Sequence, residues 1–121
     1  MEVRIKTTDY EITTEVSSYL DQRIASIEKL LGDEAETARL EVELGRDAGG
    51  QRHGANMWYA EMMVVAPGGM KVRATNRAAS INAAIDDVKE EVARQVRRDK
   101  QVHIRFLRKS GALAKRWMRW E

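Results

Sequence analysis

The chain has 121 residues, a formal net charge of +2 and no cysteine. This length suits one domain with a single hydrophobic core, and the lack of cysteine excludes thiol catalysis, disulfide bonds and cysteine-based zinc sites. No apolar run approaches the length that spans a membrane, and Glu2, Arg4 and Lys6 interrupt the start of the chain. We therefore expect no signal peptide and a cytoplasmic location.

Charge is divided unevenly along the chain. Residues 1–96 contain 12 Lys/Arg and 17 Asp/Glu, a balance of −5, whereas residues 97–121 contain 9 and 2, a balance of +7. A cationic segment on a mildly acidic body is typical of proteins that bind a polyanion, usually nucleic acid, because neutralising phosphates releases counterions. The alternative is a disordered, solvated tail.

The first half of the chain predicts a strand, a helix and a second strand. Residues 2–6 alternate apolar and charged side chains, which is typical of a strand. Thr13 is a good N-cap for a helix whose apolar residues recur at three- and four-residue steps as far as Gly32, a suitable C-cap. Alternation over residues 39–44 predicts a second strand that ends before Gly45.

A hairpin is predicted after a glycine-rich loop at residues 47–54. Residues 58–66 are aromatic and apolar enough for a strand. Pro67-Gly68-Gly69 then supplies the fixed and positive φ values that a reversal needs. The return arm, residues 70–75, alternates apolar and polar side chains, so one face meets a core and the other carries cations.

The last helix is predicted to begin near residues 78–80. Its apolar stripe continues to Val96, and its exposed face changes from acidic to basic toward the C-terminus. Cations near a helix C-terminus interact favourably with the helix dipole, but this does not account for nine of them. Because the pattern weakens after Lys100, we predict a domain at residues 1–100 and a separate basic C-terminal tail at residues 101–121.

The order of elements, β-α-β-β-β-α, predicts an α+β two-layer sandwich, with a four-stranded sheet and two helices on one face. Both helices need the same apolar face, and a right-handed crossover makes the first two strands parallel. The other face of the sheet would carry charges of both signs, from Arg4, Lys6, Arg39, Glu41, Glu43, Lys71 and Arg73.

The sequence does not predict an enzyme, because it lacks a nucleophile with a base or carboxylates paired in a cleft. Asp86 and Asp87 are adjacent on a helix and point about 100° apart, so we expect one half-buried and one solvated carboxylate. His53 and His103 have no second ligand at metal-binding spacing. We predict no catalytic residue, no metal, no cofactor and no small-molecule substrate.

Several segments share a joint pattern with a known family. They are Tyr10-Glu11-Ile12-Thr13 leading into Val16 to Leu20, the Pro67-Gly68-Gly69 hairpin, Ile81-Asn82-Ala83-Ala84-Ile85-Asp86 followed by Val88, and Ala93-Arg94-Gln95-Val96. From Val3 to about Lys100 the chain resembles the ribosome hibernation promoting factors, also called ribosome-associated translation inhibitors, in their short single-domain form.

The resemblance implies a protein that sits on the small ribosomal subunit, in the channel between head and body. There it would occupy the space of messenger RNA and transfer RNA and silence translation under stress or in stationary phase. In that family basic residues contact ribosomal RNA phosphates. The matching positions here are Arg4, Lys6, Arg23, Lys29, Lys71, Arg73, Arg77, Arg94, Arg97, Arg98 and Lys100, of which we favour the last four.

The chain departs from the family pattern in two places. Glu90 and Glu91 beside Lys89 make the last helix less basic than an RNA-binding helix ideally is. The tail beyond Lys100 matches neither the short ending of the small forms nor the dimerising domain of the long ones. Homodimerisation, and with it the pairing of ribosomes, is left open.

The tail combines aromatic and cationic side chains at Arg116, Trp117, Arg119 and Trp120. Stacking on bases contributes on the order of 1–3 kcal/mol per base, so these residues are candidate RNA contacts. The alternatives are that the tryptophans pack on the domain or a partner subunit, or anchor the chain at a membrane surface; we expect no membrane partner.

Two other functions fit the same fold. One is a protein-interaction module that regulates a transcription (sigma) factor, and the other is a free binder of structured RNA. Salt dependence separates a protein partner from RNA: with about five phosphate contacts, log affinity falls by roughly 4 units per decade of salt. A mainly apolar protein interface responds weakly.

Overall fold

The computed structural model describes residues 1–47 and 57–109, with side chains described through Val102. The main elements are β1 (Glu2–Thr8), α1 (Thr14–Leu31), β2 (Arg39–Arg46), β3 (Trp58–Ala66), β4 (Met70–Ala78) and α2 (Ile81–Lys109). Short 3-10 helices lie at Gly32–Thr37, after α1, and at Pro67–Gly69, in the β3–β4 turn.

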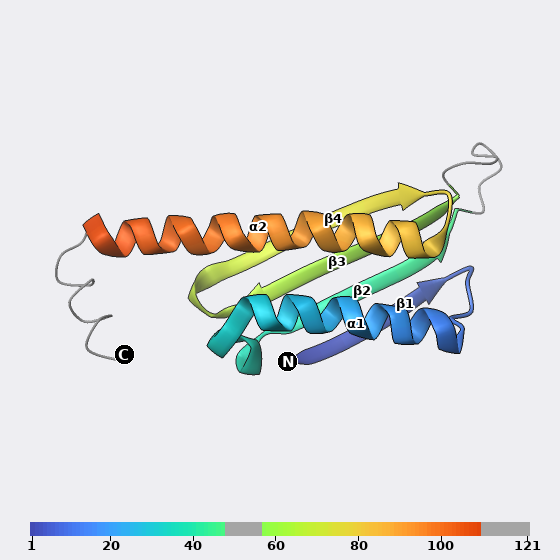
Figure 1. Ribbon diagram of the computed structural model, residues 1–121, viewed down its shortest axis with the longest axis horizontal. Helices are drawn as coiled ribbons and strands as arrows, with labels where there is room; N and C mark the ends of the chain where they lie inside the picture. Colours follow the sequence, from blue (N-terminus) through green and yellow to red (C-terminus); the bar gives the residue numbers. More distant parts are fainter. Residues whose placement is uncertain (48–56, 110–121) are drawn as a thin grey trace.

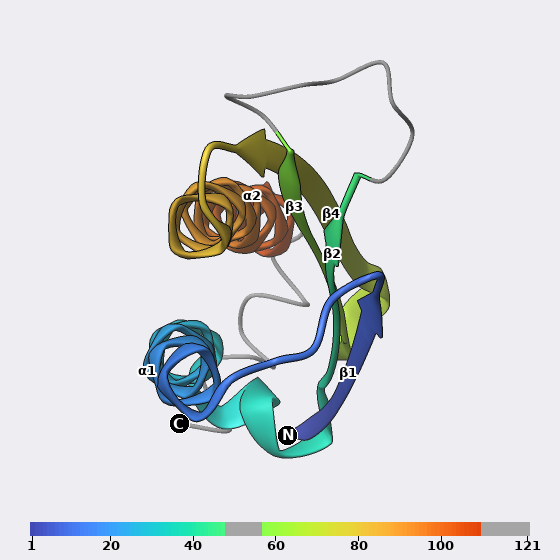
Figure 2. The same cartoon turned by 90° about the vertical axis from the view of Figure 1, so that its right-hand side faces the viewer.

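The strands form one sheet in the order β1-β2-β3-β4. β1 is parallel to β2, whereas the β2–β3 and β3–β4 pairs are antiparallel. Figures 1 and 2 show both helices on one face of this sheet, which leaves the other face open. The predicted two-layer α+β sandwich, its parallel first pair and its hairpin are confirmed.

Both ends of α1 are capped by the predicted residues. The Thr13 hydroxyl accepts a hydrogen bond from the backbone N–H of Val16 at 3.1 Å, which satisfies one of the unpaired donors of the first turn. At the other end Gly32 has φ +63°, a conformation that costs glycine little, and its N–H bonds to the carbonyl of Glu28.

The core lies between the sheet and the two helices. Leu20 and Ile27 of α1, Val88 of α2, and Leu40 and Met62 of the sheet are all fully buried. Each such side chain contributes about 1.5–3 kcal/mol. Among the described residues no polar or charged one is buried, so the charges available for binding all lie at the surface.

β2 does not end before Gly45, as the sequence suggested, but continues through it to Arg46. Gly45 pairs with Tyr59 of β3. A Cβ atom on Gly45 would overlap the Tyr59 ring, so the glycine makes room for an aromatic ring that lies across the strand. This close approach is a tertiary reason for glycine in a strand interior.

α2 continues past Lys100 to Lys109, nine residues into the segment predicted as a tail. Residues 101–109 contain neither glycine nor proline, so loss of the apolar stripe does not by itself end the helix. Figure 1 shows the last turns of α2 extending past the β3–β4 turn. The division into a domain and a functional tail stays a prediction.

Within the described part of the chain, no helix combines the length and apolar character required to cross a membrane.

Candidate nucleic-acid interface

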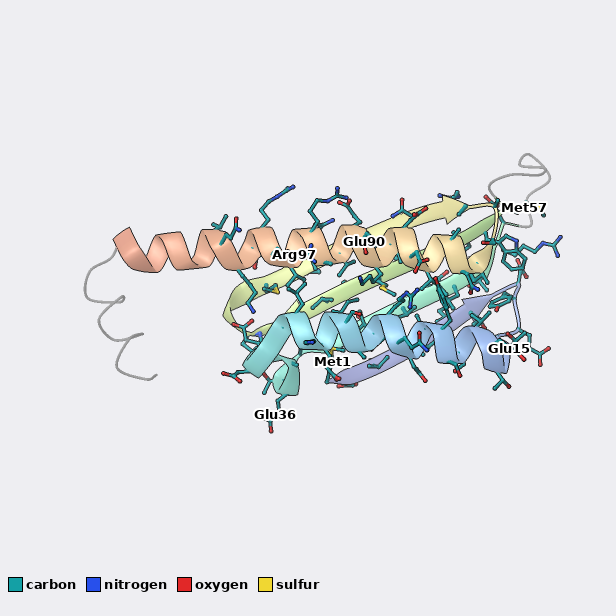
Figure 3. All side chains as sticks on the ribbon, in the orientation of Figure 1. Met1, Glu15, Glu36, Met57, Glu90 and Arg97 are labelled. Carbon is teal, nitrogen blue, oxygen red and sulfur yellow. The ribbon has the colours of Figure 1, made fainter. Side chains whose placement is uncertain are left out.

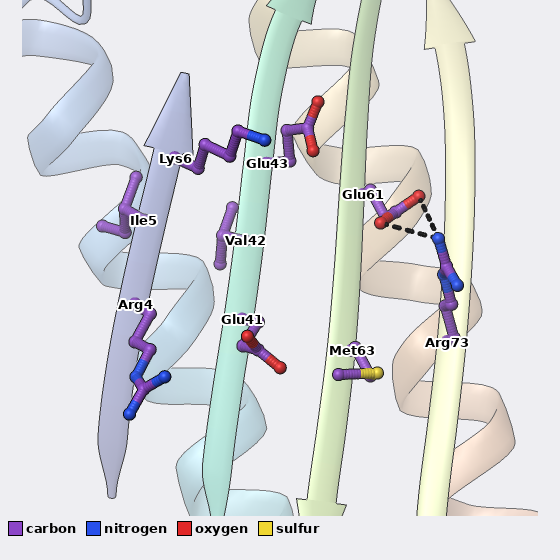
Figure 4. A pocket seen from close by; sticks show the side chains of 9 residues that line it. All are labelled: Arg4, Ile5, Lys6, Glu41, Val42, Glu43, Glu61, Met63 and Arg73. Carbon is purple, nitrogen blue, oxygen red and sulfur yellow. Dashed lines mark hydrogen bonds and ion pairs between the residues drawn. The ribbon is translucent and has the colours of Figure 1, made fainter. Parts of the chain in front are cut away.

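The open face of the sheet carries charges of both signs in ordered rows. Strand pairing aligns Arg4 with Glu41 and Lys6 with Glu43 between β1 and β2. A shallow hollow of about 400 Å³ on this face is lined by three cations and three carboxylates, together with Ile5, Val42 and Met63 (Figure 4). The charged residues are Arg4, Lys6, Arg73, Glu41, Glu43 and Glu61, so their formal charges cancel.

Most of the candidate cations on the sheet have acidic partners. The Arg73 guanidinium donates to both oxygens of Glu61 at 3.0 and 3.1 Å. Further pairs join Arg4 to Glu2 at 2.8 Å, Arg39 to Glu41 at 3.6 Å and Arg77 to Asp47 at 3.6 Å. Of the sheet candidates, only Lys6 and Lys71 make no ion pair with another described residue.

Glu43 is held in its charged form on this face. The Tyr59 hydroxyl donates to Glu43 at 2.6 Å and the Thr8 hydroxyl at 3.2 Å. The Tyr59 hydrogen bond lowers the pKa of Glu43, and Thr8 contributes in the same direction. The pKa of Tyr59 is raised, first by burial and then by its bond to Glu43. This carboxylate is therefore a fixed negative charge on the open face.

On the helix layer, Asp86 of α2 joins the two helices through Tyr19 and Arg23 of α1. The Tyr19 hydroxyl donates to Asp86, and Arg23 Nε donates to the other carboxylate oxygen at 2.8 Å. The bond from Tyr19, followed by that from Arg23, lowers the pKa of Asp86. Asp86 is half-buried and Asp87 exposed, as predicted.

A groove of about 310 Å³ runs between α1 and α2 and carries only positive charge. It is lined by Ser26, Lys29 and Leu30 of α1 and by Lys89, Ala93 and Arg97 of α2. No carboxylate belongs to this described lining. Lys29 and Arg97 are exposed, whereas the Lys89 side chain is only 19% exposed and its Nζ lies 3.1 Å from Glu90 Oε1.

The four cations that the sequence analysis favoured have different surroundings. Figure 3 shows Arg97 on α2; Arg97 and Arg98 are exposed and make no ion pair within the described chain. Arg94 is exposed too, but pairs with Glu91 one turn earlier. Lys100 donates to the carbonyl oxygens of Leu30 at 2.9 Å and Leu31 at 3.5 Å, so it caps the C-terminal end of α1.

Sequence reasoning missed Lys89 as a lining residue of the groove. Lys89, Ala93 and Arg97 recur every fourth residue and so share one face of α2. The sequence shows this spacing, but it does not show that this face of α2 lies next to Lys29 of α1. The tail candidates Arg116, Trp117, Arg119 and Trp120 lie outside the described residues, as does His53. The part of the chain that is described has no cluster of three or more His, Asp or Glu suited to a metal.

Solved structures with a similar fold include the following two. The N-terminal domain of Thermus thermophilus Protein Y is 27% identical, with a TM-score of 0.64, over 81% of this chain and 98% of that one. A ribosomal subunit interface protein from Coxiella burnetii has a TM-score of 0.65 at 9% identity, over 84% and 99%, and shows the shared fold alone.

Comparison with curated proteins gave no match. The sequence model of one family, described as sigma 54 modulation protein / S30EA ribosomal protein, matches residues 3–103. This match covers the sheet except Glu2, all of α1 and most of α2. The chain therefore belongs to the sigma 54 modulation protein / S30EA ribosomal protein family, a family of ribosome-associated modulation factors and not a known enzyme family.

Proposed function

We propose that this protein binds the small ribosomal subunit in the cytoplasm and inhibits translation by occupying the channel of messenger RNA and transfer RNA. Inhibition would serve ribosome hibernation under stress or in stationary phase. The proposal rests on membership of the family, on the 27% identity to the Protein Y domain, and on the charge of the groove between α1 and α2.

That groove is the single observation that carries the proposal. Phosphates bind best where cations have no carboxylate to compete for them. The groove is lined by Lys29, Lys89 and Arg97 and by no described acid. Lys89 pairs with Glu90, which is not part of the lining, whereas Lys29 and Arg97 make no ion pair with a described residue. The hollow on the open sheet face has as many cations but an equal number of carboxylates. The helix layer is therefore the face that favours RNA.

The exposed side of α2 extends the cationic surface beyond the groove. Arg94 and Arg98 are one turn apart, and both are exposed. Arg94 would exchange Glu91 for a phosphate, at a modest cost because exposed ion pairs are weak. We assign the first RNA contacts to Lys29, Lys89, Arg94, Arg97 and Arg98.

The remaining candidates have a smaller part in this proposal. Arg23 and Lys100 are engaged in joining α1 to α2. Arg4 and Arg73 are paired with acids on the sheet, and Arg77 with Asp47 just after β2. Lys6 and Lys71 are exposed on the open face and serve below as matched controls.

The test is cosedimentation of the purified protein with separated small and large ribosomal subunits. We expect Lys29→Glu/Arg97→Glu to weaken binding to the small subunit by at least about tenfold, because two charge-assisted hydrogen bonds are replaced by repulsion. The control, Lys6→Glu/Lys71→Glu, changes the net charge by the same amount but leaves the groove intact. Its affinity for the small subunit should therefore stay much closer to that of the unmodified protein.

Each outcome has a distinct meaning. Equal weakening by both double variants would mean that total charge, and not the groove, governs binding. Binding to neither subunit at low salt would overturn the proposal and favour a protein-interaction module. Competition with messenger RNA and transfer RNA for the small subunit then tests whether the channel is occupied.

A further inference from the structure

β1 is an uncovered edge of the sheet with apolar side chains at its surface. Among the described residues, the exposed large hydrophobic side chains are Val3 at 37%, Ile5 at 45% and Val102 at 57%. Strand pairing aligns Val3 with Leu40 and Ile5 with Val42 of β2. Leu40 and Val42 are buried in the core, so Val3 and Ile5 continue the same apolar rows to the edge of the sheet.

The opposite edge of the sheet is different. On β4 the side chains of the corresponding face, Met70, Val72 and Ala74, are only 5–8% exposed. Figure 2 shows α2 on the side of β3 and β4 and leaves β1 at the far edge. The two helices therefore cover the sheet unequally, and the apolar surface left over belongs to β1.

The backbone of β1 is also available for pairing. The N–H of Glu2 bonds to the carbonyl of Ala38, which precedes β2. Because successive residues of a strand direct their backbone groups to opposite sides, Val3, Ile5 and Thr7 direct theirs away from β2. The strand is seven residues long, pairs with β2 at every position and contains neither proline nor glycine. Such an edge is a template for another strand.

We propose that β1 pairs antiparallel with β1 of a second copy of this chain, around a two-fold axis at Arg4. In this register Val3 faces the partner's Ile5 in hydrogen-bonded pairs, with both side chains on the helix side. On the open face Glu2 of each chain faces Lys6 of the other chain. The two sheets become one, and four exposed apolar side chains cover one another.

The charges select this register over its neighbours. A two-fold axis at Ile5 would place Arg4 opposite the partner's Lys6 twice, and like charges directly opposite destabilise a sheet. An axis at Val3 would pair only residues 1–5. The axis at Arg4 pairs residues 1–7 and sets Glu2 of each chain opposite Lys6 of the other, which gives two attractive pairs. It also sets Arg4 opposite the partner's Arg4, a single like pair, and Glu2 of the same chain, 2.8 Å from Arg4, offsets that repulsion.

The contact is small, so the dimer should be weak, with a Kd in the micromolar range or above. Cross-linking through an introduced cysteine tests the proposed dimer, because the chain itself contains no cysteine. Opposed residues of a non-hydrogen-bonded antiparallel pair have Cα atoms about 4.5 Å apart, within the roughly 4.4–6.8 Å that a disulfide spans. Arg4→Cys should therefore form a disulfide-linked dimer at least about tenfold faster than Lys71→Cys on the other edge.

A charge exchange tests the register without a covalent bond. Lys6→Glu places two like pairs across the axis and should raise the dimer Kd on the order of tenfold in sedimentation equilibrium. Glu2→Lys/Lys6→Glu restores opposite charges and should recover the original Kd, whereas Lys71→Glu, with the same change of net charge as Lys6→Glu, should leave it unchanged.

The proposal is overturned if the unmodified chain stays monomeric up to about 1 mM, or if both cysteine variants cross-link at the same slow rate. Circular dichroism of each variant verifies that the fold is intact. Because these measurements use the protein alone, their result is independent of ribosome binding.

Discussion

Asp86 links α2 to α1 through side-chain contacts. It accepts hydrogen bonds from Tyr19 and Arg23, both on α1. Arg23 in turn lies over the Tyr19 ring, 4.1 Å from its centroid. These contacts join the same two helices, α1 and α2, that line the groove proposed to bind phosphate, so they help to position the two helices relative to one another.

We predict that Asp86→Asn lowers the stability of the protein at neutral pH but much less in acid. The pKa of Asp86 is lowered from its ordinary 3.8. Its contribution is therefore complete above pH 3.8 and is lost as the pH falls through the lowered value. Urea unfolding of both proteins at pH 6 and at pH 2–3 measures this. Asp87→Asn, an exposed neighbour, is the control, and an equal difference at both pH values would contradict the prediction.

Gly45 illustrates a residue whose identity depends on a distant ring. We predict that Gly45→Ala destabilises the protein by about 1–3 kcal/mol, because the added methyl group overlaps the Tyr59 ring. In a Tyr59→Ala background the same change should cost clearly less. A double-mutant cycle by chemical unfolding measures the coupling, and additive effects would show that the overlap is not the cause.

At the scale of the element, α2 combines a structural and a binding function on different faces. Ala84, Ile85, Val88, Val92 and Val96 are buried against the sheet and α1. Lys89 and Arg97, each one turn from Ala93, line the groove. A helix repeat of 3.6 residues separates these faces, so binding residues are replaceable without loss of the core.

Lys100 and Arg98 should respond differently to substitution, although they are two residues apart. Lys100→Met removes the donor to the carbonyls of Leu30 and Leu31, and we expect a loss of about 0.3–1 kcal/mol of stability. Arg98→Met should leave stability unchanged and weaken ribosome binding. Thermal unfolding and cosedimentation of both variants make the comparison, and a stronger binding defect for Lys100→Met would assign it to the RNA contact instead.

At the scale of the whole molecule, the two faces of the sandwich differ in how charge is arranged: the hollow on the open face is lined by three cations and three carboxylates, and the groove by three cations. On the open face, acids of β2 and β3 lie between the cations of β1 and β4. On the helix layer, the groove is lined by cations and by no described acid, and of these cations only Lys89 has a described acidic partner, Glu90. The net charge of +2 for the whole chain therefore does not identify the binding face, whereas the local arrangement of charge does.

Salt dependence should report the number of phosphates that the molecule contacts. With about five contacts, log affinity for the small subunit should fall by roughly 4 units per decade of salt. Arg94→Glu/Arg97→Glu/Arg98→Glu should keep the fold, since all three are exposed, and reduce the slope by about 2–3. Cosedimentation across a salt series measures both slopes; an unchanged slope and affinity for the folded variant would remove these residues from the interface.

The sequence by itself determined the order and type of the elements, the caps of α1 and the position of the hairpin. These follow from local patterns: a two-residue period, a helical period, and residues such as Thr13 and Gly32 with strong backbone preferences. The resemblance to the family also came from the sequence, and the family match confirms it.

Only the tertiary structure decided which cations are free to bind. Arg73 finds Glu61 on the neighbouring strand β3, and Arg77 finds Asp47 just after β2. Arg23 finds Asp86 at a separation of 63 residues, and Lys100 caps a helix that ends 69 residues earlier. Lys29 and Lys89 meet only because α1 and α2 lie side by side. The sequence gives the charge of each residue. Its ion-pair partners, however, come from contacts between residues that are distant in the sequence, and local sequence patterns carry no information about such contacts.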